Sequence, residues 1–391
     1  MAAYKPQIEY TEKGWRRATD TNRHHRESGW DYRRRAIYHF TFVPTDRYPL
    51  FGLLEAPTPQ EARIELNKYE QQVKDRLFHL PQFYLTKGYA LKVLASQIMP
   101  DHIHLVLQVL EPLPKSIGAV VRGFKAACTK LYKEQYYPSG ENAAEMHEES
   151  TARQEQKAQN EQTQEQNKAR GSIVHFARIF AGRGSIWQSD AAYYHERILH
   201  SADQLRRMID YVHDNPRRLS LKRANPQLFR LHQRVPVAGF SCTTLGNQFL
   251  LDFPMKGVIQ CSRRLIQEEI DHKKELCLEE AERGTVFVSA GISEGEKQIC
   301  RALRKEGYPL IIILKDGFPK ENDPHYQYFK PQGVYFEACA EGRLLLIEPN
   351  EELFADKDIE KQIYAKTGAL PHDTLRYHFL ALNELARNIV N

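Results

Sequence analysis

Two histidines separated by one residue, His102 and His104, are the first side chains whose type and spacing could do chemistry. On a β-strand, residues i and i+2 face the same side, so both imidazoles would project together. Two imidazoles on one face are half of a divalent-metal site. A pair of polar residues on a solvent-exposed face gives the same pattern. However, apolar residues alternate with the histidines over residues 103–107, so the strand is expected to be internal, where imidazoles need partners such as a metal ion.

A second candidate is the pair Tyr211 and Asn215, which lie four residues apart in a segment with helical periodicity. This spacing places a phenol and an amide oxygen on one face of a helix. They could serve as a nucleophile and a metal ligand. The alternative stays open that Tyr211 belongs to the core and that Asn215 only ends the helix before Pro216.

The elements that must position these residues are predicted from periodicity and from turn residues. Strands are expected at residues 36–43, 89–99 and 102–110, and helices at 58–78, 115–136 and 201–215, the last ended by Pro216. Residues 1–33 are predicted to form a basic, extended N-terminal arm. Residues 139–170 contain seven Glu and six Gln and almost nothing apolar. They are expected to form a mobile insertion, with a solvated helix as the alternative.

The pattern changes after residue 234. Short apolar runs at residues 257–262, 285–293, 308–317 and 343–349 alternate with helical segments at 263–283 and 294–306. Buried strands alternating with helices predict an α/β domain with a mainly parallel sheet. The expected organisation is therefore a first domain at 34–234, a second at 241–350 and a helical tail at 351–391.

Composition excludes several classes of protein. The chain has 391 residues, a net charge of +5 and 41% hydrophobic residues, which is enough for a sizeable core and too much for a wholly disordered chain. No apolar run approaches 18 residues and the first 13 residues have no hydrophobic region, so neither a membrane span nor a secretory signal is expected. The six cysteines form no CxxC pair, which predicts buried thiols in a reducing cytoplasm.

Four segments in a fixed order carry a resemblance to a known family. They are AIYHFTFVPTDRYPLFG at 36–52, MPDHIHLVL at 99–107, SIWQSDAAYYHERIL at 185–199 and QLRRMIDYVHDNP at 204–216. Over about residues 34–221 the chain resembles the REP-associated tyrosine transposases, which belong to the single-tyrosine HUH transposases. The resemblance implies an α+β fold, an antiparallel sheet flanked by helices, and an enzyme that cleaves and transfers DNA strands.

The resemblance also assigns roles to residues. It implies that His102, His104 and Asn215 hold Mg²⁺ or Mn²⁺, and that Tyr211 cleaves single-stranded DNA through a covalent phosphotyrosine. The implied partner is single-stranded DNA with hairpin structure; a homodimer, and an active site completed within one chain or across two, both stay open. Two departures concern the choice of DNA: the insertion is longer than expected, and Asp101 stands where Asn is expected. The alternative function is non-catalytic binding of structured single-stranded DNA.

Basic residues cluster where a DNA-processing domain would need them, although a solvated helix face looks similar. The residues expected to contact DNA are Arg33, Arg34, Arg35, Lys115, Arg122, Lys125, Lys130, Arg206, Arg207, Arg217 and Arg218. For His195, contact with substrate and a structural role are both open.

The second domain resembles the Rossmann-like domain of DNA-processing protein A. The loop matching that family's serine–glycine segment contains Ser289, Gly291 and Ser293. Because such a loop opens a helix, its amides could bind the phosphate of a nucleotide or of DNA. An ordinary tight turn, and an interaction module with no nucleotide, are the alternatives.

Overall fold

The computed structural model describes residues 8–11, 14–17, 27, 29–136, 185–187, 195–318, 334–368 and 374–391, and the expected insertion at 139–170 lies outside them. The chain divides into two compact units, Met1–Ser220 and Leu221–Asn391. Antiparallel strands and helices build the first unit, in agreement with the predicted α+β class.

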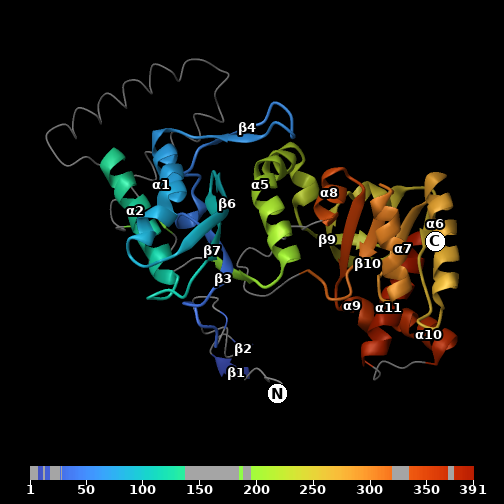
Figure 1. Ribbon diagram of the computed structural model, residues 1–391. Helices are drawn as coiled ribbons and strands as arrows, with labels where there is room; N and C mark the ends of the chain where they lie inside the picture. Colours follow the sequence, from blue (N-terminus) through green and yellow to red (C-terminus); the bar gives the residue numbers. More distant parts are fainter. Residues whose placement is uncertain are drawn as a thin grey trace. The chain divides into compact units, whose positions relative to one another are not determined.

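A four-stranded antiparallel sheet forms the centre of the first unit (Figure 1), with the strand order β6-β7-β3-β8. Its strands are β3 (Ala36–Phe42), β6 (Leu91–Met99), β7 (His102–Val109) and β8 (His195–Leu199). The first three confirm the strands expected from alternating apolar residues. Within the N-terminal arm, β1 (Ile8–Thr11) pairs with β2 (Gly14–Arg17), which the sequence reading did not predict.

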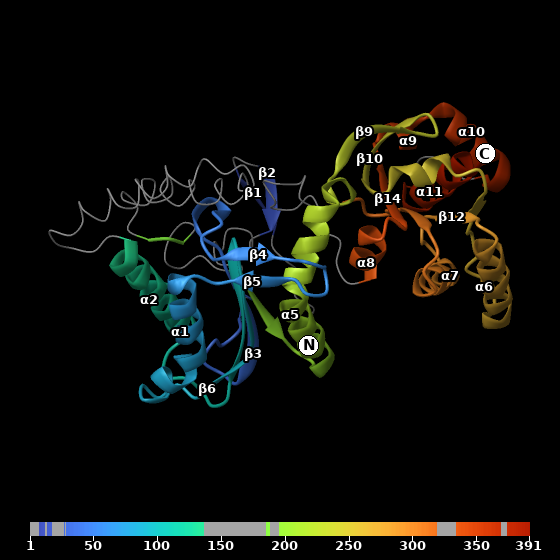
Figure 2. The same cartoon turned by 90° about the horizontal axis from the view of Figure 1, so that it is seen from above.

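The two faces of this sheet pack against different helices, as Figures 1 and 2 show. The aromatic face of β3, with Tyr38, Phe40 and Phe42 fully buried, lies in the core that includes α1 (Lys68–Leu85) and α2 (Gly118–Tyr136). The opposite face packs against α5 (Ala202–Ala224) through a smaller apolar cluster around Val106 and Val212. The histidine pair on β7 and the pair of Tyr211 and Asn215 on α5 therefore lie on the elements that meet at this interface.

Helix α1 begins ten residues later than predicted. The sequence before it forms an antiparallel pair, β4 (Leu53–Glu55) with β5 (Arg63–Glu65), and a 3-10 turn lies at Thr45–Arg47. Asn67 caps the helix, accepting from the amides of Tyr69 and Glu70, while the Glu70 carboxylate accepts from the Asn67 amide. This capping box fixes the start of the helix more strongly than the apolar spacing that suggested residue 58.

Helix α5 does not end at Asn215, so that prediction was wrong. The helix continues through Pro216 to Ala224. Proline lacks the amide that would bond to the fourth preceding carbonyl, which destabilises a helix interior. Here Pro216, Arg218 and Ser220 are buried, so packing holds the second half of the helix in place.

In the second unit, six strands form one sheet in the order β11-β12-β13-β14-β10-β9. The pairs β11–β12, β12–β13 and β13–β14 are parallel, and the pairs β14–β10 and β10–β9 are antiparallel, which confirms a mainly parallel sheet. Its strands are β9 (His232–Val237), β10 (Phe240–Gly246), β11 (Lys256–Val258), β12 (Val286–Ser289), β13 (Leu310–Ile313) and β14 (Leu344–Pro349). Two 3-10 turns lie at Pro226–Phe229 and Gln248–Asp252.

Helices cover both faces of this sheet. One apolar cluster joins it to α6 (Gln267–Glu282), α7 (Glu294–Lys305) and α8 (Val334–Ala340). Another joins it to α9 (Glu352–Ala355), α10 (Lys357–Thr367) and α11 (Thr374–Val390).

Two segments that were predicted to lie outside the second domain are part of the second unit. The helices expected as a tail at 351–391 supply one of its two cores, and β9 precedes the domain start expected at residue 241. All six cysteines are free and buried, as predicted. None of the helices in the described part of the chain is long and apolar enough to cross a membrane.

Candidate active site

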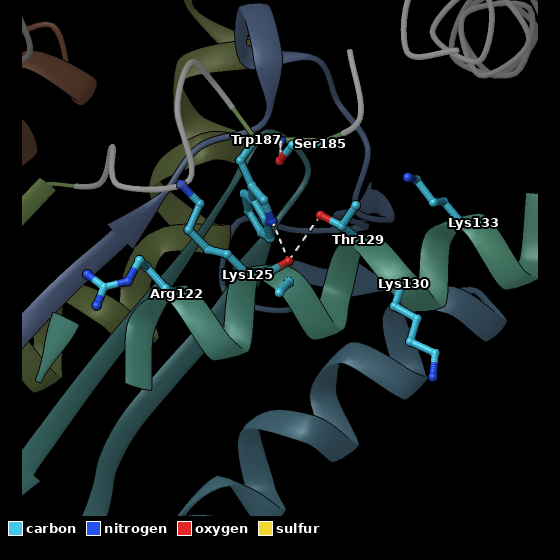
Figure 3. Close-up of a pocket in the computed structure, with 8 residues that line it drawn as sticks. Arg122, Lys125, Thr129, Lys130, Lys133, Ser185 and Trp187 are labelled. Atoms are coloured by element: carbon cyan, nitrogen blue, oxygen red, sulfur yellow. Dashed lines mark hydrogen bonds between the residues drawn. The ribbon is translucent and has the colours of Figure 1, made fainter. Parts of the chain in front are cut away.

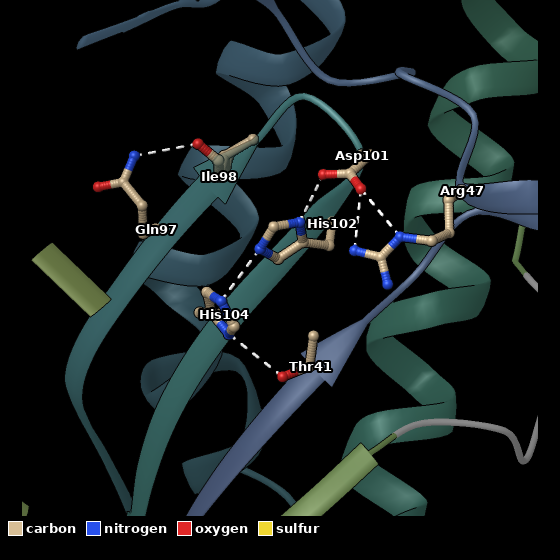
Figure 4. A network of polar contacts seen from close by, with 7 residues as sticks. All are labelled: Thr41, Arg47, Gln97, Ile98, Asp101, His102 and His104. Atoms are coloured by element: carbon tan, nitrogen blue, oxygen red, sulfur yellow. Dashed lines mark hydrogen bonds and ion pairs between the residues drawn. The ribbon is translucent and has the colours of Figure 1, made fainter. Parts of the chain in front are cut away.

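The two histidines of the HxH motif lie together at the start of β7. Their Nε2 atoms are 3.0 Å apart (Figure 4), and the rings meet edge to face. His104 is 4% exposed and lies opposite Thr41 on β3 and Gln97 on β6, which confirms that the strand is internal. His102, the first residue of the strand, is half-buried. The motif thus presents two ring nitrogens at one point on the α5 face of the sheet.

His102 is held through its other ring nitrogen. Its Nδ1 lies 2.6 Å from the Oδ1 atom of Asp101, and the Oδ2 atom of that carboxylate accepts from Nε and Nη2 of Arg47 at 3.0 and 2.9 Å (Figure 4). Burial raises the pKa of Asp101, but the hydrogen bond and charge of His102, together with Arg47, outweigh it and hold this pKa well below the usual range. Asp101 is therefore a carboxylate that accepts from both neighbours.

His104 is held in the same way by different groups. Its Nδ1 lies 3.0 Å from the Nε2 atom of His39 and 3.2 Å from the Oγ1 atom of Thr41. Burial, followed by the charges of Arg197 and His102, lowers the pKa of His39 to about 4. Burial also lowers the pKa of His104 well below its usual value. Both rings are consequently neutral at neutral pH, the form in which imidazole binds a metal.

Tyr211 lies beside this pair. Its ring centroid is 5.5 Å from that of His104. Arg218 lies two turns further along α5, and its guanidinium is 5.5 Å from the ring centroid of Tyr211. The residue is 38% exposed. Burial raises the pKa of Tyr211, although Arg218, a hydrogen bond with Asn215 and Arg47 all act to lower it. The phenol and the histidine pair come from one chain and one unit.

Asn215, expected as the third ligand, is directed toward its own helix. Its amide nitrogen donates to the backbone oxygen of Tyr211 at 2.7 Å, and the side chain is 8% exposed. Its role as a metal ligand stays a prediction. Within the described residues no group of three or more His, Cys, Asp or Glu side chains has the arrangement of a metal site. The set expected from the sequence contains only two of these, since its third member is an amide.

The basic residues expected to contact DNA fall into different environments. Several form pairs with carboxylates near them in sequence, which are Arg33 with Asp31, Lys130 with Glu134, Arg206 with Asp203 and Arg217 with Asp214. Arg34 lies over the ring of Trp30, and Arg218 over that of Tyr211. Lys115, Arg122, Arg207 and Arg35 are exposed. His195 begins β8, and its side chain lies outside the described residues.

Lys125 and its neighbours line a pocket of about 340 Å³ on α2, on the side of the sheet away from α5 (Figure 3). Lys125 is only 2% exposed, and burial lowers its pKa to about 8. Trp187 is fixed by donating from Nε1 to the Lys125 backbone oxygen at 2.9 Å. The residues that line the pocket in the described part of the chain are Arg122, Lys125, Ala126, Thr129, Lys130, Lys133, Ser185 and Trp187, with no carboxylate among them.

In the second unit, the loop expected to bind a nucleotide has partners for its amides within the chain. The Glu296 carboxylate accepts from the amides of Ile292 and Ser293 at 2.7 and 3.3 Å. The Ser289 hydroxyl accepts from the Gly291 amide at 3.1 Å, and Ser293 caps α7. An anion at this loop would have to displace Glu296, so the arrangement favours the tight turn that the sequence left open.

Several residues of the site were not predicted from the sequence, notably His39, Thr41 and Arg47. Alternation along residues 36–43 places His39 and Thr41 on the non-aromatic face of their strand, which was an available signal. Their contact with His104 depends on the register of β3 against β7, which no local pattern specifies. Arg47 reaches Asp101 from a 3-10 turn inside the segment 36–52, and its type and spacing there indicate no chemical role.

No protein-family description matches the chain, and no curated protein matches it. Among solved structures, it is similar to a crystal structure of a "putative transposase" from Deinococcus radiodurans R1, with 15% identity and a TM-score of 0.22. The similarity covers 49% of this chain and 96% of the other. A likeness of this extent is no evidence for a function.

Proposed function

We propose that the first unit is a metal-dependent endonuclease and strand transferase that acts on hairpin-containing single-stranded DNA, with Tyr211 as the nucleophile. One observation carries the proposal. The phenol of Tyr211 lies against His104, whose Nε2 atom is 3.0 Å from that of His102. A nucleophile beside two convergent imidazoles is an arrangement that can hold a metal ion and attack a phosphodiester.

The two imidazoles fit a divalent cation. In octahedral coordination at roughly 2.1 Å, adjacent ligand atoms are separated by roughly 3.0 Å, which matches the observed nitrogen separation. Metal-binding histidines almost always have a partner at the other ring nitrogen, and here Asp101 and His39 occupy those positions. A bound Mg²⁺ or Mn²⁺ would neutralise charge on the scissile phosphate. His102 and His104 would hold it, with Asn215 as the proposed third ligand.

The chain's own residues account for the covalent step. The Tyr211 oxygen attacks phosphorus, a phosphorus–oxygen bond forms to the enzyme, and the bond to the leaving deoxyribose oxygen breaks. The phenol loses its proton during attack and the leaving oxygen gains one. Because burial raises the pKa of Tyr211, the charge of Arg218 near its ring is needed to stabilise the developing phenolate. The phosphotyrosine retains the bond energy for rejoining.

Hairpin-containing single-stranded DNA is the proposed partner because the family resemblance over residues 34–221 implies it. The exposed cations Lys115 and Arg207, together with the cationic pocket that Arg122 and Lys125 line, are the proposed contacts to phosphates. Recognition of a hairpin would combine phosphate contacts with stacking of unpaired bases.

The test of the function is a covalent adduct. Full-length protein is incubated with single-stranded hairpin DNA and Mn²⁺, and denaturing electrophoresis resolves protein–DNA adducts. Tyr211→Phe removes one oxygen, so the adduct should be lost while DNA affinity stays within about twofold, because the phenol contributes little to the core. Tyr364→Phe, at an exposed tyrosine of the second unit, is the matched control and should retain the adduct.

The rival function is non-catalytic binding of structured single-stranded DNA. It is favoured by the raised pKa of Tyr211 and by the direction of the Asn215 amide. Under this alternative, wild type and Tyr211→Phe would bind hairpin DNA equally and neither would cut it with Mg²⁺ or Mn²⁺. Cleavage by Tyr211→Phe without any adduct would instead identify a metal-dependent hydrolase.

We propose that the second unit is a Rossmann-like accessory domain that supports DNA binding by the first. The parallel strands β11 to β14 between two helical layers support this proposal. Truncation after Ala224 should weaken hairpin binding without removing Tyr211 or the histidines. Unchanged affinity of a folded 1–224 fragment would contradict the role.

A further inference from the structure

Each imidazole of the HxH pair has a second group at its Nδ1 atom, and these groups come from different parts of the chain. Asp101 lies 2.6 Å from Nδ1 of His102, while His39 lies 3.0 Å from Nδ1 of His104. Arg47 in turn binds the far oxygen of Asp101. The arrangement is a chain of side chains that begins at Arg47 and ends at His39, with the two proposed ligands in the middle. Figure 4 shows the part of it from Arg47 to His104.

The partners decide which ring nitrogens carry protons. An ionised carboxylate only accepts hydrogen bonds, so the short contact with Asp101 requires a proton on Nδ1 of His102. A neutral His102 then has a lone pair at Nε2. For His104, a proton on Nδ1 needs an acceptor, and Nε2 of His39 is within hydrogen-bond distance. With both Nδ1 atoms protonated, both Nε2 lone pairs face one position that a cation can occupy, whereas a proton on either Nε2 atom would instead form a hydrogen bond across the 3.0 Å between them.

We propose that Asp101 and His39 are positioning residues that fix the metal-binding tautomers of His102 and His104. The proposal rests on the proposed function, because it assigns the two Nε2 atoms to a divalent cation. His39 must present an acceptor at Nε2, so its own proton belongs on Nδ1. Arg47 acts one step further out by holding the Asp101 carboxylate against His102.

The proposal also explains the charge at position 101. An Asn there would accept the same hydrogen bond through its amide oxygen but would bring no negative charge. A carboxylate raises the basicity of the imidazole that it holds and so strengthens a bond to a cation. Loss of such a partner typically costs about 10–100-fold in metal affinity. Asp101→Asn should therefore lose less affinity than Asp101→Leu, which has no acceptor.

The first experiment measures Mn²⁺ binding to full-length protein by isothermal titration calorimetry, without DNA. Asp101→Leu and His39→Phe should each weaken binding about 10–100-fold. Asp101→Asn should recover part of the loss, and His39→Gln should do the same because its amide can present an oxygen near the Nε2 position. Asp75→Leu, at an exposed carboxylate on α1, is the matched control and should bind Mn²⁺ as wild type does.

The second experiment reads the tautomers directly. Long-range ¹H–¹⁵N spectra of histidine-labelled, metal-free protein should show His102 and His104 protonated at Nδ1, and His39→Phe should shift His104 toward the other tautomer. Protonation at Nε2 of His102 or His104 in wild type would overturn the proposal, whatever the metal affinity. So would Mn²⁺ binding that is equal in Asp101→Leu, His39→Phe and wild type.

The two experiments separate this proposal from the proposed function. If wild type binds Mn²⁺ and forms the adduct but the variants bind equally well, the positioning roles fail and the strand transferase stands. If wild type binds no Mn²⁺ although both rings carry protons on Nδ1, the tautomer assignment stands and the metal-dependent function fails. Circular dichroism of each variant identifies loss of folding, and the conservative variants at both positions keep the test decisive in that case.

Discussion

The cationic pocket on α2 leads to a quantitative prediction about the salt dependence of DNA binding. Arg122, Lys125 and Lys133 line it from one face of α2, and Figure 3 shows Lys130 pointing away from Trp187. Replacing the first three with Gln, Met and Gln removes three positive charges and keeps side chains of similar length. If the pocket holds the backbone of a single strand, each of these cations displaces counterions from phosphate.

The magnitude follows from the number of contacts. For single strands the logarithm of affinity falls with the logarithm of salt by about 0.7 per phosphate contact, so three contacts contribute a slope of about 2. Between 50 and 200 mM salt this slope amounts to roughly 20-fold in affinity. Wild type should lose that much more affinity than the triple variant over this range. Burial lowers the pKa of Lys125 to about 8, so the assay belongs at pH 7, where its amine is charged.

Fluorescence anisotropy with a labelled single-stranded hairpin, at four salt concentrations between 50 and 200 mM, measures the slope. A control variant with Lys68, Lys74 and Arg76 changed to Gln removes the same charge from the exposed side of α1. A slope in the pocket variant equal to that of wild type would refute the reasoning. A reduction of the same size in the control would show that net charge, and not the pocket, sets the salt dependence.

Three further predictions concern the first unit. His102→Ala should abolish adduct formation in the electrophoretic assay while single-strand binding largely survives; unimpaired cleavage would defeat the metal assignment. Burial raises the pKa of Glu70 from 4.5 to about 7, so its contribution to stability is present below pH 4.5 and is lost as pH rises through 7. Glu70→Gln should thus remove up to about 3 kcal/mol of pH-dependent destabilisation. The melting temperature of wild type should fall relative to that of the variant between pH 5 and 8, and parallel curves of melting temperature against pH for the two proteins would contradict this. Trp187→Phe loses the bond to the Lys125 carbonyl and should cost about 1 kcal/mol in denaturant unfolding, whereas no change would show that this bond contributes nothing.

Alternating apolar residues predicted the central strands well, because on β3 and β7 one face is aromatic or aliphatic and buried under two helices. The helix boundaries were less predictable. Apolar spacing from Ala62 onward suggested an early start for α1, but Arg63–Glu65 pairs with another strand and Asn67 caps the helix. Pro216 suggested an end for α5, yet burial of the following turns keeps the helix intact. In both cases a contact between distant segments overrode a local signal.

The site was predictable only in part, for a related reason. Spacing alone identified His102 with His104, and Tyr211 with Asn215, but nothing in either motif requires the two to meet. Their meeting depends on α5 packing against β7, which the family resemblance implied and the structure shows. His39 escaped notice because a lone histidine on a strand is unremarkable until register places it beside another ring.

Three side chains of the site, His39, His104 and Tyr211, are uncharged at neutral pH. Burial lowers the pKa of His39 and His104 and raises that of Tyr211, so without ligands two imidazoles and a phenol are uncharged at neutral pH. Uncharged groups cost little to bury compared with ions. Neutral imidazoles are nevertheless ready for a cation, whereas a neutral phenol is a weak nucleophile. In the proposed reaction, Tyr211 would therefore become reactive only when a phosphate and its counter-cation reach the site, which confines strand cleavage to bound DNA.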